Sequence, residues 1–341
     1  MAQNGPSRVR CLGCKWHRGS MHFVTAEHTR RLILNGLAII VLGLLWLAGS
    51  SMDLQKYEPA HAAILLTIGV TVVMLLLYSI RSFASKGVAS PSKYVFVALW
   101  IGLALSYAKV HPIAAKHVLT QGNDSEDALL RGADNLLQRH YPYYSRTYLG
   151  NPITPMPGAL LLDSPFAGFR KAGFQNLFWF GVFQLFTLRF FRLRSTALIC
   201  QLLVLANAHT FANLMTGADY PTNCLYVCAA SFWFLRESES NGKWPYWLSS
   251  VWLGLALSSR PTYLLVMPLI LAAYLVQHLG LAKAAKRLAQ PLAVTCAVTV
   301  PFYLYDPTHF SPLHVASFLS SMTPAYQHFL FAVLTLSLIH I

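Results

Sequence analysis

The chain has 341 residues, of which 55% are hydrophobic and only 11% are charged, and its mean hydropathy is +0.47. A soluble domain usually carries about 25% charged residues, so this composition argues against an ordinary water-soluble protein. The net charge of +14 could indicate nucleic-acid binding, but the basic residues cluster at the ends of apolar runs. That pattern is typical of membrane orientation and of contact with anionic lipids, so we expect membrane lipids and no nucleic acid as partners.

Residues 1–31 form a polar, basic tail, and beyond it apolar runs alternate with polar turns. Most runs have close to the ~20 residues that a bilayer-spanning helix needs. The predicted spans, in chain order, are 32–50, 60–80, 94–110, 174–188, 195–215, 220–235, 245–259, 261–279, 288–305 and a final run 328–341. The sequence thus predicts an all-α polytopic membrane protein with about nine to ten transmembrane helices. One long outer loop containing short helices interrupts them.

The basic residues also predict the orientation, because cytoplasmic loops of membrane proteins carry an excess of Lys and Arg. We expect the tail 1–31 to lie in the cytoplasm, and most of the 26 basic residues then fall on that side. The long polar loop 111–172 becomes extracytoplasmic. Asp219 and Arg260, in short connectors, fall at the same outer face as the loop.

Three carboxylates lie within four residues of this loop, at Asp124, Glu126 and Asp127. Like charges this close raise the pKa of one member and prepare it for proton transfer near neutral pH. The same residues could instead begin a helix, since Asp and Ser cap helix N-termini and acids favour that end of the dipole. A helix-compatible run, 128–137, does follow, and the two interpretations are compatible.

Further along the loop, aromatic residues stand beside proline and glycine. His140, Tyr141 and Tyr143 come first, and the segment 150–158 contains three prolines and two glycines. Proline fixes the local backbone, so we expect an irregular, shaped segment here. Aromatic faces and hydroxyls would suit a sugar ring, although tyrosines also gather at membrane interfaces because they are amphipathic.

Arg260 lies between two apolar runs with almost no connector, on the side that the positive-inside rule disfavours. Its guanidinium could bind a phosphate, whose geometry it matches. It could equally anchor the chain to lipid headgroups.

A metal site is not predicted. Cys11, Cys14 and His17 resemble half of a zinc site, but no second ligand pair follows at the usual spacing. Asp219 could be a metal ligand or a helix cap, and the glycine and proline around it favour the cap. The sequence leaves open whether a divalent metal is needed.

The last six residues read LSLIHI, which is what a common sequencing-library transposon end gives when it is translated in frame. We therefore expect the chain to be truncated at its C-terminus. The alternative is a genuine apolar tail.

Several motifs between residues 110 and 310 are similar to one family of membrane enzymes. They are the acids at 124–127, the triplet 141–143, the segments 147–158 and 164–166, and the connectors 217–220 and 259–261. In these motifs the chain resembles the C-type superfamily of integral-membrane glycosyltransferases. It looks most like the bacterial polyprenol-dependent mannosyltransferase-like proteins of glycosyltransferase family 87.

The resemblance implies that residues 32–341 form a transmembrane glycosyltransferase domain in a bacterial plasma membrane. It implies transfer of a mannose-like sugar from a polyprenyl-phosphate donor to an extracytoplasmic glycan or lipid acceptor, with an acid of the outer loop as general base. That base falls on Asp127, Asp124 or Glu126, with Asp127 preferred. The expected substrate-binding residues are Arg260, Tyr141, Tyr143, Asp219, Asp134 and His140. The alternative function is a non-catalytic transporter or lipid-handling protein.

Overall fold

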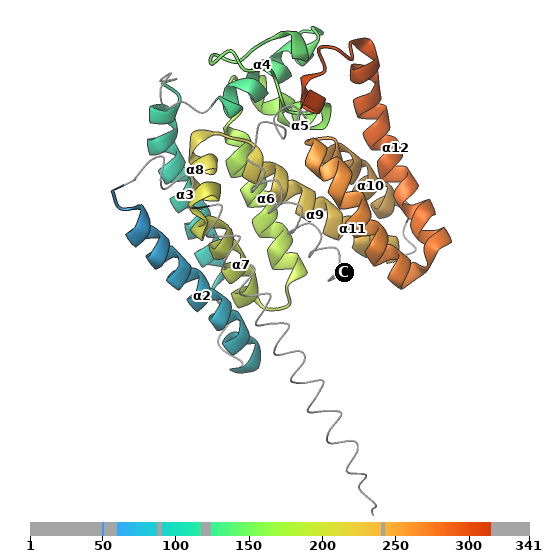
Figure 1. Ribbon diagram of the computed structural model, residues 1–341. Coiled ribbons are helices and arrows are strands. Elements are labelled where there is room, and N and C mark those ends of the chain that lie inside the picture. The colour runs from blue at the N-terminus through green and yellow to red at the C-terminus, as the bar shows by residue number, and fades with distance from the viewer. Residues whose placement is uncertain (1–49, 51–59, 87–90, 117–123, 240–242, 315–341) are drawn as a thin grey trace, which may run out of the picture.

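The computed structural model describes residue 50 and residues 60–86, 91–116, 124–239 and 243–314 (Figure 1). These residues are organised in helices, and the described part contains one isolated antiparallel bridge, between Arg146 and Pro152, but no strand. The all-α prediction is therefore confirmed for this part of the chain. The tail 1–31, the final run 328–341 and all but the last residue of the run 32–50 lie outside the described residues.

The helices follow the predicted runs closely. In chain order they are α2 (Ala62–Lys86), α3 (Lys93–Ala114), α4 (Ser125–Leu137), η1 (Pro142–Tyr144), α5 (Pro157–Ala167), α6 (Phe174–Phe190), α7 (Arg194–Ala206), α8 (Ala208–Thr216), α9 (Tyr220–Glu239), α10 (Lys243–Leu257), α11 (Pro261–Leu279), α12 (Leu281–Tyr305) and η2 (Ser311–His314). Proline begins both α5 and α11, where its missing N–H costs nothing because the first turn has no acceptor for it.

The described residues support fewer spans than the sequence predicts. By length and composition, three described helices could cross a membrane, namely α3, α11 and α12, and counting the bent pair α7–α8 as one span gives four. Helices α6 and α10 have only 17 and 15 residues, and α9 ends in the charged residues Arg236, Glu237 and Glu239. The described part thus supports an all-helical protein with a few apolar spans, and not nine to ten.

The run 195–215 is not the single helix that the sequence predicts. It forms α7 and α8, which meet at an angle of 77°. Asn207 separates them with an extended backbone (ψ 117°), and its side chain accepts a hydrogen bond from the backbone N–H of Thr210 at 2.9 Å. Asparagine competes for backbone hydrogen bonds in this way, so it ends one helix and caps the next.

Helix α12 begins seven residues earlier than predicted. Residues 280–287 lie between two predicted spans, where the sequence predicts a polar turn, but residues 281–287 are the first part of this helix. Leucine, alanine, lysine and arginine are strong helix formers, which explains the extension. Arg287 of this segment lies over the ring of Tyr246, 4.3 Å from its centroid, and so holds α12 against α10.

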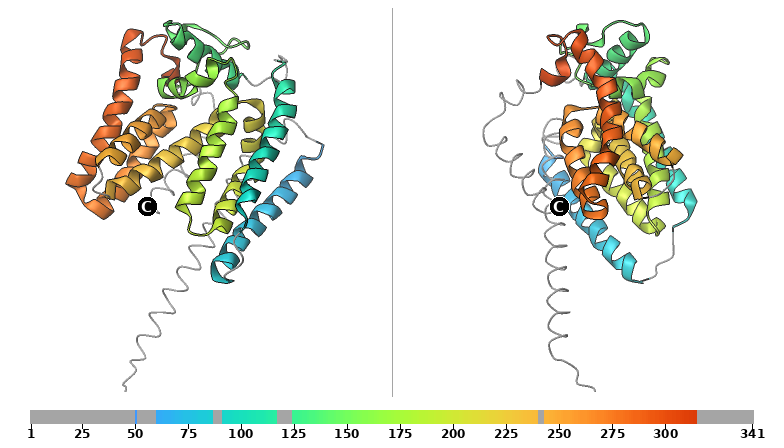
Figure 2. Two further views of the ribbon diagram at one scale, coloured as in Figure 1. Left: turned by 180° about the vertical axis from the view of Figure 1, so that it is seen from behind. Right: turned by 90° about the vertical axis from the view of Figure 1, so that its right-hand side faces the viewer.

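The long helices pack side by side, and α4, η1 and α5 cover one end of the bundle (Figures 1 and 2). Helix α10 packs against both α9 and α12, α6 packs against α9, and α2 packs against α7. A separate apolar cluster holds the covering helices together and includes Leu129, Tyr143, Ile153, Leu160 and Phe310. The covering segment is therefore a packed layer with its own core.

The start of α5 is fixed to the junction between α10 and α11. The backbone N–H of Gly158 donates to the carbonyl oxygen of Ser258 at 2.8 Å, and that of Met156 donates to Ser259 at 3.1 Å. A Cβ at position 158 would overlap the backbone of Leu255 and Ser258, so only glycine permits this approach. These bonds bring the covering layer directly against Arg260.

Candidate functional site

The acids at 124–127 lie at the start of α4, as the helix-start interpretation predicts, but their side chains reach different parts of the protein. Asp124 is the N-cap residue, yet its carboxylate makes no capping bond. It accepts hydrogen bonds from Thr147 Oγ1 and from Asn151 Nδ2, the latter at 2.8 Å. Asp124 therefore fastens the irregular segment after η1 to the start of α4.

The carboxylate of Asp127 is occupied by hydrogen bonds to nearby residues. Its side chain is buried, it receives Nε–H of Arg131 at 2.8 Å, and it accepts the backbone N–H of Tyr148 at 2.7 Å. A carboxylate with these two partners has little freedom to approach a substrate. The preference for Asp127 as the base stays a prediction, and this geometry does not favour it.

Glu126 has different surroundings. Its Oε2 lies 2.7 Å from Nε2 of His111, and its Oε1 accepts the backbone N–H of Gly173 at 2.8 Å. His111 in turn stacks on Tyr107, with ring centroids 4.6 Å apart. Three elements therefore orient this carboxylate: the end of α3, the start of α4 and the residue that precedes α6.

Glu126 is the acid of the three that lines a cavity of about 770 Å³. Such a volume lies within the ~300–1,000 Å³ that is typical of small-molecule sites. The lining residues come from α3, α4, α6 and the α5–α6 connection, and they are Trp100, Ala104, Tyr107, Ala108, His111, Pro112, Glu126, Arg170, Lys171, Phe174, Leu177 and Phe178. The cavity thus joins an aromatic wall to a charged end that contains the Glu126–His111 pair.

Gly217 closes the space behind Glu126. It ends α8 in the left-handed conformation, with φ +82°, where a Cβ is disfavoured. A Cβ built at this position would lie 2.5 Å from Oε2 of Glu126 and 2.6 Å from its carboxyl carbon. The connector 217–220, one of the family-like motifs, therefore packs directly against the candidate base.

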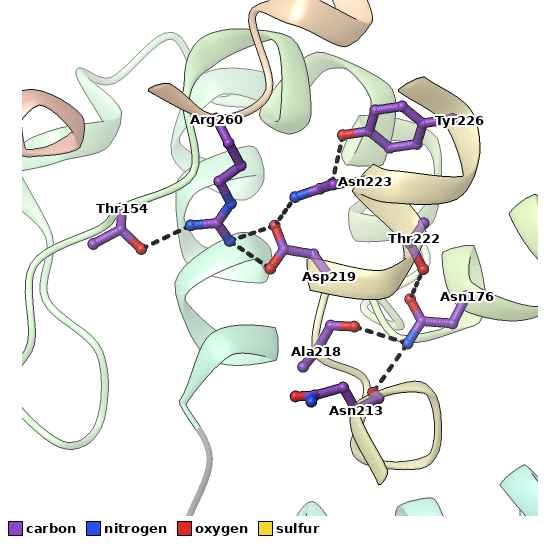
Figure 3. A network of polar contacts seen from close by, with 9 residues as sticks. All are labelled: Thr154, Asn176, Asn213, Ala218, Asp219, Thr222, Asn223, Tyr226 and Arg260. Atoms are coloured by element: carbon purple, nitrogen blue, oxygen red, sulfur yellow. Dashed lines mark hydrogen bonds and ion pairs between the residues drawn. The ribbon is translucent and has the colours of Figure 1, made fainter. Parts of the chain in front are cut away.

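Arg260 forms a buried ion pair with Asp219 (Figure 3). Its Nη2 bonds to both oxygens of the carboxylate, at 2.6 Å to Oδ2, and its Nη1 donates to Oγ1 of Thr154 at 3.2 Å. The guanidinium also lies over the ring of Tyr220, 4.6 Å from its centroid. Arg260 is only 9% exposed and Asp219 is fully buried, so the pair lies inside the protein.

The burial of Arg260 bears on its predicted roles. A lipid-headgroup anchor would keep its guanidinium at the surface, so that interpretation is wrong. Phosphate binding by Arg260 stays a prediction, but Asp219 already neutralises the charge that would attract a phosphate. Asp219 directly precedes α9, where the cap interpretation places it, and its carboxylate bonds to Arg260 and to Asn223.

A wider polar network extends from this ion pair into α6, α8 and α9 (Figure 3). Asn223 donates to Asp219 and accepts a hydrogen bond from the hydroxyl of Tyr226. Asn176 of α6 donates to carbonyl groups of α8 and to that of Ala218, just after the helix, at 3.1 Å, and it accepts a hydrogen bond from Thr222. Buried polar groups of this kind are costly unless they are paired, so the network fixes the 217–223 turn in one arrangement.

Asp163 is the residue that sequence reasoning missed. It lies on α5, its side chain is fully buried, and neither carboxyl oxygen has a hydrogen-bond partner among the described residues. Burial raises its pKa from the ordinary value of 3.8 to about 8, and the nearby charges of Asp219 and Glu126 act in the same direction. Asp163 therefore holds its proton at neutral pH and lies within the field of both acids.

The sequence does carry a signal for Asp163. It stands in an apolar run, 159–167, that contains no other charged residue. A lone ionisable side chain in a run that is expected to be buried is costly to leave charged, so it is a candidate for function. The family-like motifs contain the acids at 124–127 but not Asp163.

The remaining predicted substrate residues lie apart from Glu126 or serve the packing. Tyr143 is buried, and its hydroxyl donates to the carbonyl of Pro155, so the structure does not support its role in binding substrate. The hydroxyl of Tyr141 donates to the carbonyl of Phe302 at 2.8 Å, near the end of α12. Tyr141 therefore attaches the covering layer to α12, whereas the bond of Tyr143 lies within the layer.

Asp134 and His140 lie at the other end of α4. Asp134 follows Glu126 by eight residues, which corresponds to about 12 Å along a helix. It accepts a hydrogen bond from Gln138 at 2.9 Å, and the exposed His140 lines a different, smaller cavity. The structure does not bring these two residues into the cavity with Glu126.

No family model matches the chain, and no curated protein or solved structure matches it either. The site therefore has to be interpreted from its own geometry. Among the described residues, no group of three or more His, Cys, Asp or Glu side chains is arranged to hold a metal ion.

Proposed function

We propose that this chain is a membrane glycosyltransferase that moves a sugar from a polyprenyl-phosphate donor to a glycan or lipid acceptor. The observation that carries the proposal is the Glu126–His111 pair at the charged end of the 770 Å³ cavity. A carboxylate oriented by an imidazole beside an aromatic wall suits an enzyme that takes a proton from a hydroxyl next to a bound sugar. The mannose-like sugar is part of this proposal and rests on the family resemblance.

The membrane arrangement is part of the same proposal. We propose a multi-pass protein of about nine to ten spans in a bacterial plasma membrane, with its N-terminus in the cytoplasm and residues 111–172 outside. Support comes from the apolar helices α3, α11 and α12 and from the basic turn between α6 and α7, which contains Arg192. The contact between α5 and the Arg260 junction also agrees with it, since both segments are expected at the outer face.

The reaction follows from the placement of Glu126. An acceptor hydroxyl attacks the anomeric carbon of the sugar, and the bond from that carbon to the phosphate oxygen breaks. Glu126 accepts the hydroxyl proton, and polyprenyl phosphate leaves with the bonding electrons. Each carboxylate oxygen has two acceptor sites, so Glu126 can receive the hydroxyl while it keeps its bonds to His111 and Gly173.

Glu126 is preferred over Asp127 and Asp124 because of what the three side chains contact. Asp127 and Asp124 bind backbone and side-chain donors of the irregular segment 147–151, so they stabilise the covering layer. Glu126 lines the cavity, and its carboxylate bonds to His111 of α3 and to Gly173 before α6. Its substitution should therefore affect chemistry, whereas substitution of the other two should affect folding.

The direct test is an assay of sugar transfer from a polyprenyl-phosphate sugar by the purified full chain, as wild type and as Glu126→Gln. The matched control is Glu239→Gln, which makes the same chemical change at the exposed end of α9, about 30 Å along that helix from Asp219. We expect Glu126→Gln to lose at least 100-fold in rate and Glu239→Gln to retain full activity. Equal activity of Glu126→Gln and the wild type would remove the proposed base.

One observation favours the alternative, a non-catalytic transporter or lipid-handling protein. Transporters often place binding sites where a helix is broken, and α7 and α8 form such a broken pair with a bend of 77°. This alternative predicts that the protein moves or binds the lipid without consuming the sugar donor. Release of free polyprenyl phosphate during turnover therefore separates the two functions.

A further inference from the structure

We propose that Arg170 and Lys171 form the phosphate-binding end of the Glu126 cavity, and that the occupant is a single-chain isoprenyl phosphate. The anion site is inferred from the geometry of the cavity, while the identity of the lipid rests on the proposed function. The sequence suggests Arg260 as the residue that binds phosphate. We instead place phosphate binding at the connection between α5 and α6.

The cavity lining has two chemically different parts. Trp100, Phe174, Leu177 and Phe178 supply an apolar and aromatic wall. The charged end carries Arg170 and Lys171 together with Glu126 and His111. This division fits an amphiphile whose hydrocarbon lies along the helices and whose anionic head meets the two cations.

The two cations are available for a ligand. Among the residues that the structure describes, neither Arg170 nor Lys171 forms an ion pair with a carboxylate, and both are exposed. Lys171 does have an aromatic contact, with Nζ 5.1 Å from the ring centroid of Phe174, a residue of the cavity wall. Arg260, by contrast, already bonds to Asp219. A phosphate would therefore meet free positive charge at 170–171 and a neutralised pair at 260.

The backbone of Arg170 adds an independent observation. Arg170 has φ +55°, and the N–H of Lys171 bonds to the carbonyl of Phe166 at 3.2 Å. This is the helix ending in which glycine usually occupies the left-handed position. An arginine is less favourable there than glycine, so the local fold does not require this side chain. The strained position presents a guanidinium at the edge of the cavity.

The size and position of the cavity favour an isoprenyl phosphate over a bilayer phospholipid. A volume of about 770 Å³ suits a sugar-phosphate head and the first isoprene units of one chain. Phosphate at 170–171 would also place the adjoining sugar near the Glu126–His111 pair, since all four residues line the same cavity. We therefore commit to a single-chain lipid monophosphate, either free or bearing its sugar.

The experiment measures equilibrium binding of an isoprenyl phosphate without a sugar to the purified full chain in detergent, so no turnover is needed. Probes for comparison are the uncharged isoprenol of the same length, inorganic phosphate and phosphatidylglycerol. The variants are Arg170→Gly and Lys171→Gln, with Arg139→Gly as the matched control. Arg139 also has a left-handed backbone (φ +62°) at the end of a loop helix, but it does not line this cavity.

We expect Arg170→Gly to fold at least as well as the wild type, because glycine relieves the backbone penalty. It should nonetheless bind the isoprenyl phosphate about 10- to 100-fold more weakly, as should Lys171→Gln. Arg139→Gly should bind like the wild type, and isoprenol should bind weakly to every variant.

The proposal is overturned if the wild type binds isoprenol as tightly as the phosphate, or if Arg170→Gly and Lys171→Gln both keep wild-type affinity. Competition by phosphatidylglycerol at equal concentration would show a bilayer-lipid site, and equal competition by inorganic phosphate would show a site for free phosphate. Either result overturns the proposal. If binding depends on Arg170 but no sugar is transferred, the proposed function fails and the anion site stands. If sugar transfer depends on Glu126 but substitution of Arg170 and Lys171 leaves the affinity for isoprenyl phosphate unchanged, only the proposed anion site is wrong.

Discussion

Nε2 of His111 lies 2.7 Å from Oε2 of Glu126, and this contact joins the end of α3 to the start of α4. The N–H of Gly173 holds the other oxygen of the same carboxylate at 2.8 Å, just before α6 begins. The candidate base is thus fixed where the apolar helices meet the covering layer. Residues that position Glu126 should therefore affect activity without touching a substrate.

Gly217→Ala tests this positioning. A methyl group at residue 217 would collide with the carboxylate of Glu126 and would also strain a backbone with φ +82°. We expect a stability loss of about 1 kcal/mol from the backbone alone and, in addition, a fall in transfer rate of at least 10-fold. The control is Gly150→Ala, since Gly150 has φ +83° but nothing within 4 Å of its added Cβ. Equal activity of the two variants would show that residue 217 does not act through Glu126.

The buried ion pair should matter mainly for stability. Arg260→Ala leaves the buried carboxylate of Asp219 without its partner, which is expected to cost about 3–5 kcal/mol. Arg131→Ala removes a pair in which the arginine is 47% exposed, and the carboxylate of Asp127 keeps its bond from the backbone N–H of Tyr148, so a smaller loss is expected. Thermal unfolding in detergent should therefore separate the two variants clearly. Similar midpoints would mean that the 219–260 pair is solvated and free to take a ligand.

The raised pKa of Asp163 predicts that the free energy of unfolding depends on pH. Burial and the charges of Asp219 and Glu126 raise its pKa from 3.8 to about 8. Between these values the folded protein keeps a proton that the unfolded chain has released. Stability therefore falls as pH rises from about 4 to about 8, at up to about 1.4 kcal/mol per pH unit.

The substitution Asp163→Asn isolates this effect, because an amide cannot ionise. Relative to the wild type, the variant should gain stability steadily from pH 5 to pH 8 and show a constant difference above that range. The measurement is the thermal unfolding midpoint of both proteins across this series. Parallel curves would mean that Asp163 is ionised in the folded protein and has a partner there.

Tyr141 provides a test of its structural role against the predicted substrate role. Its hydroxyl donates to the carbonyl of Phe302 at 2.8 Å and to that of Asp306 at 3.2 Å. Tyr141→Phe should therefore lower stability by about 1 kcal/mol while leaving the KM for the donor unchanged. A rise in KM without loss of stability would restore the substrate-binding prediction.

Much of the helical organisation could be predicted from the sequence, because apolar runs and proline starts are local signals. Pro261 begins α11 where expected, and the helix-compatible run after Asp127 became α4. The break at Asn207 was missed because a single polar residue in an apolar run gives only a weak signal. The early start of α12 was missed because basic residues in 281–287 were interpreted as a turn, although they favour helix.

The site was less predictable, since it depends on contacts between distant segments. The clustering of acids at 124–127 predicts that one of them is a catalytic base. Which of the three lines a cavity depends on contacts with Gly173 and His111, and the positions of these two residues follow from packing. The pairing of Asp219 with Arg260 spans 41 residues and likewise has no local signal. Asp163 did have one, as a lone acid in an apolar run.

The most direct test of the account separates binding from chemistry at Glu126. A single-turnover measurement with saturating polyprenyl-phosphate sugar gives the transfer rate, and the same donor gives its Kd for the wild type and for Glu126→Gln. The account predicts a rate at least 100-fold lower in the variant with a Kd unchanged within about threefold. An unchanged transfer rate would contradict it, and so would a rate that falls only because the donor no longer binds.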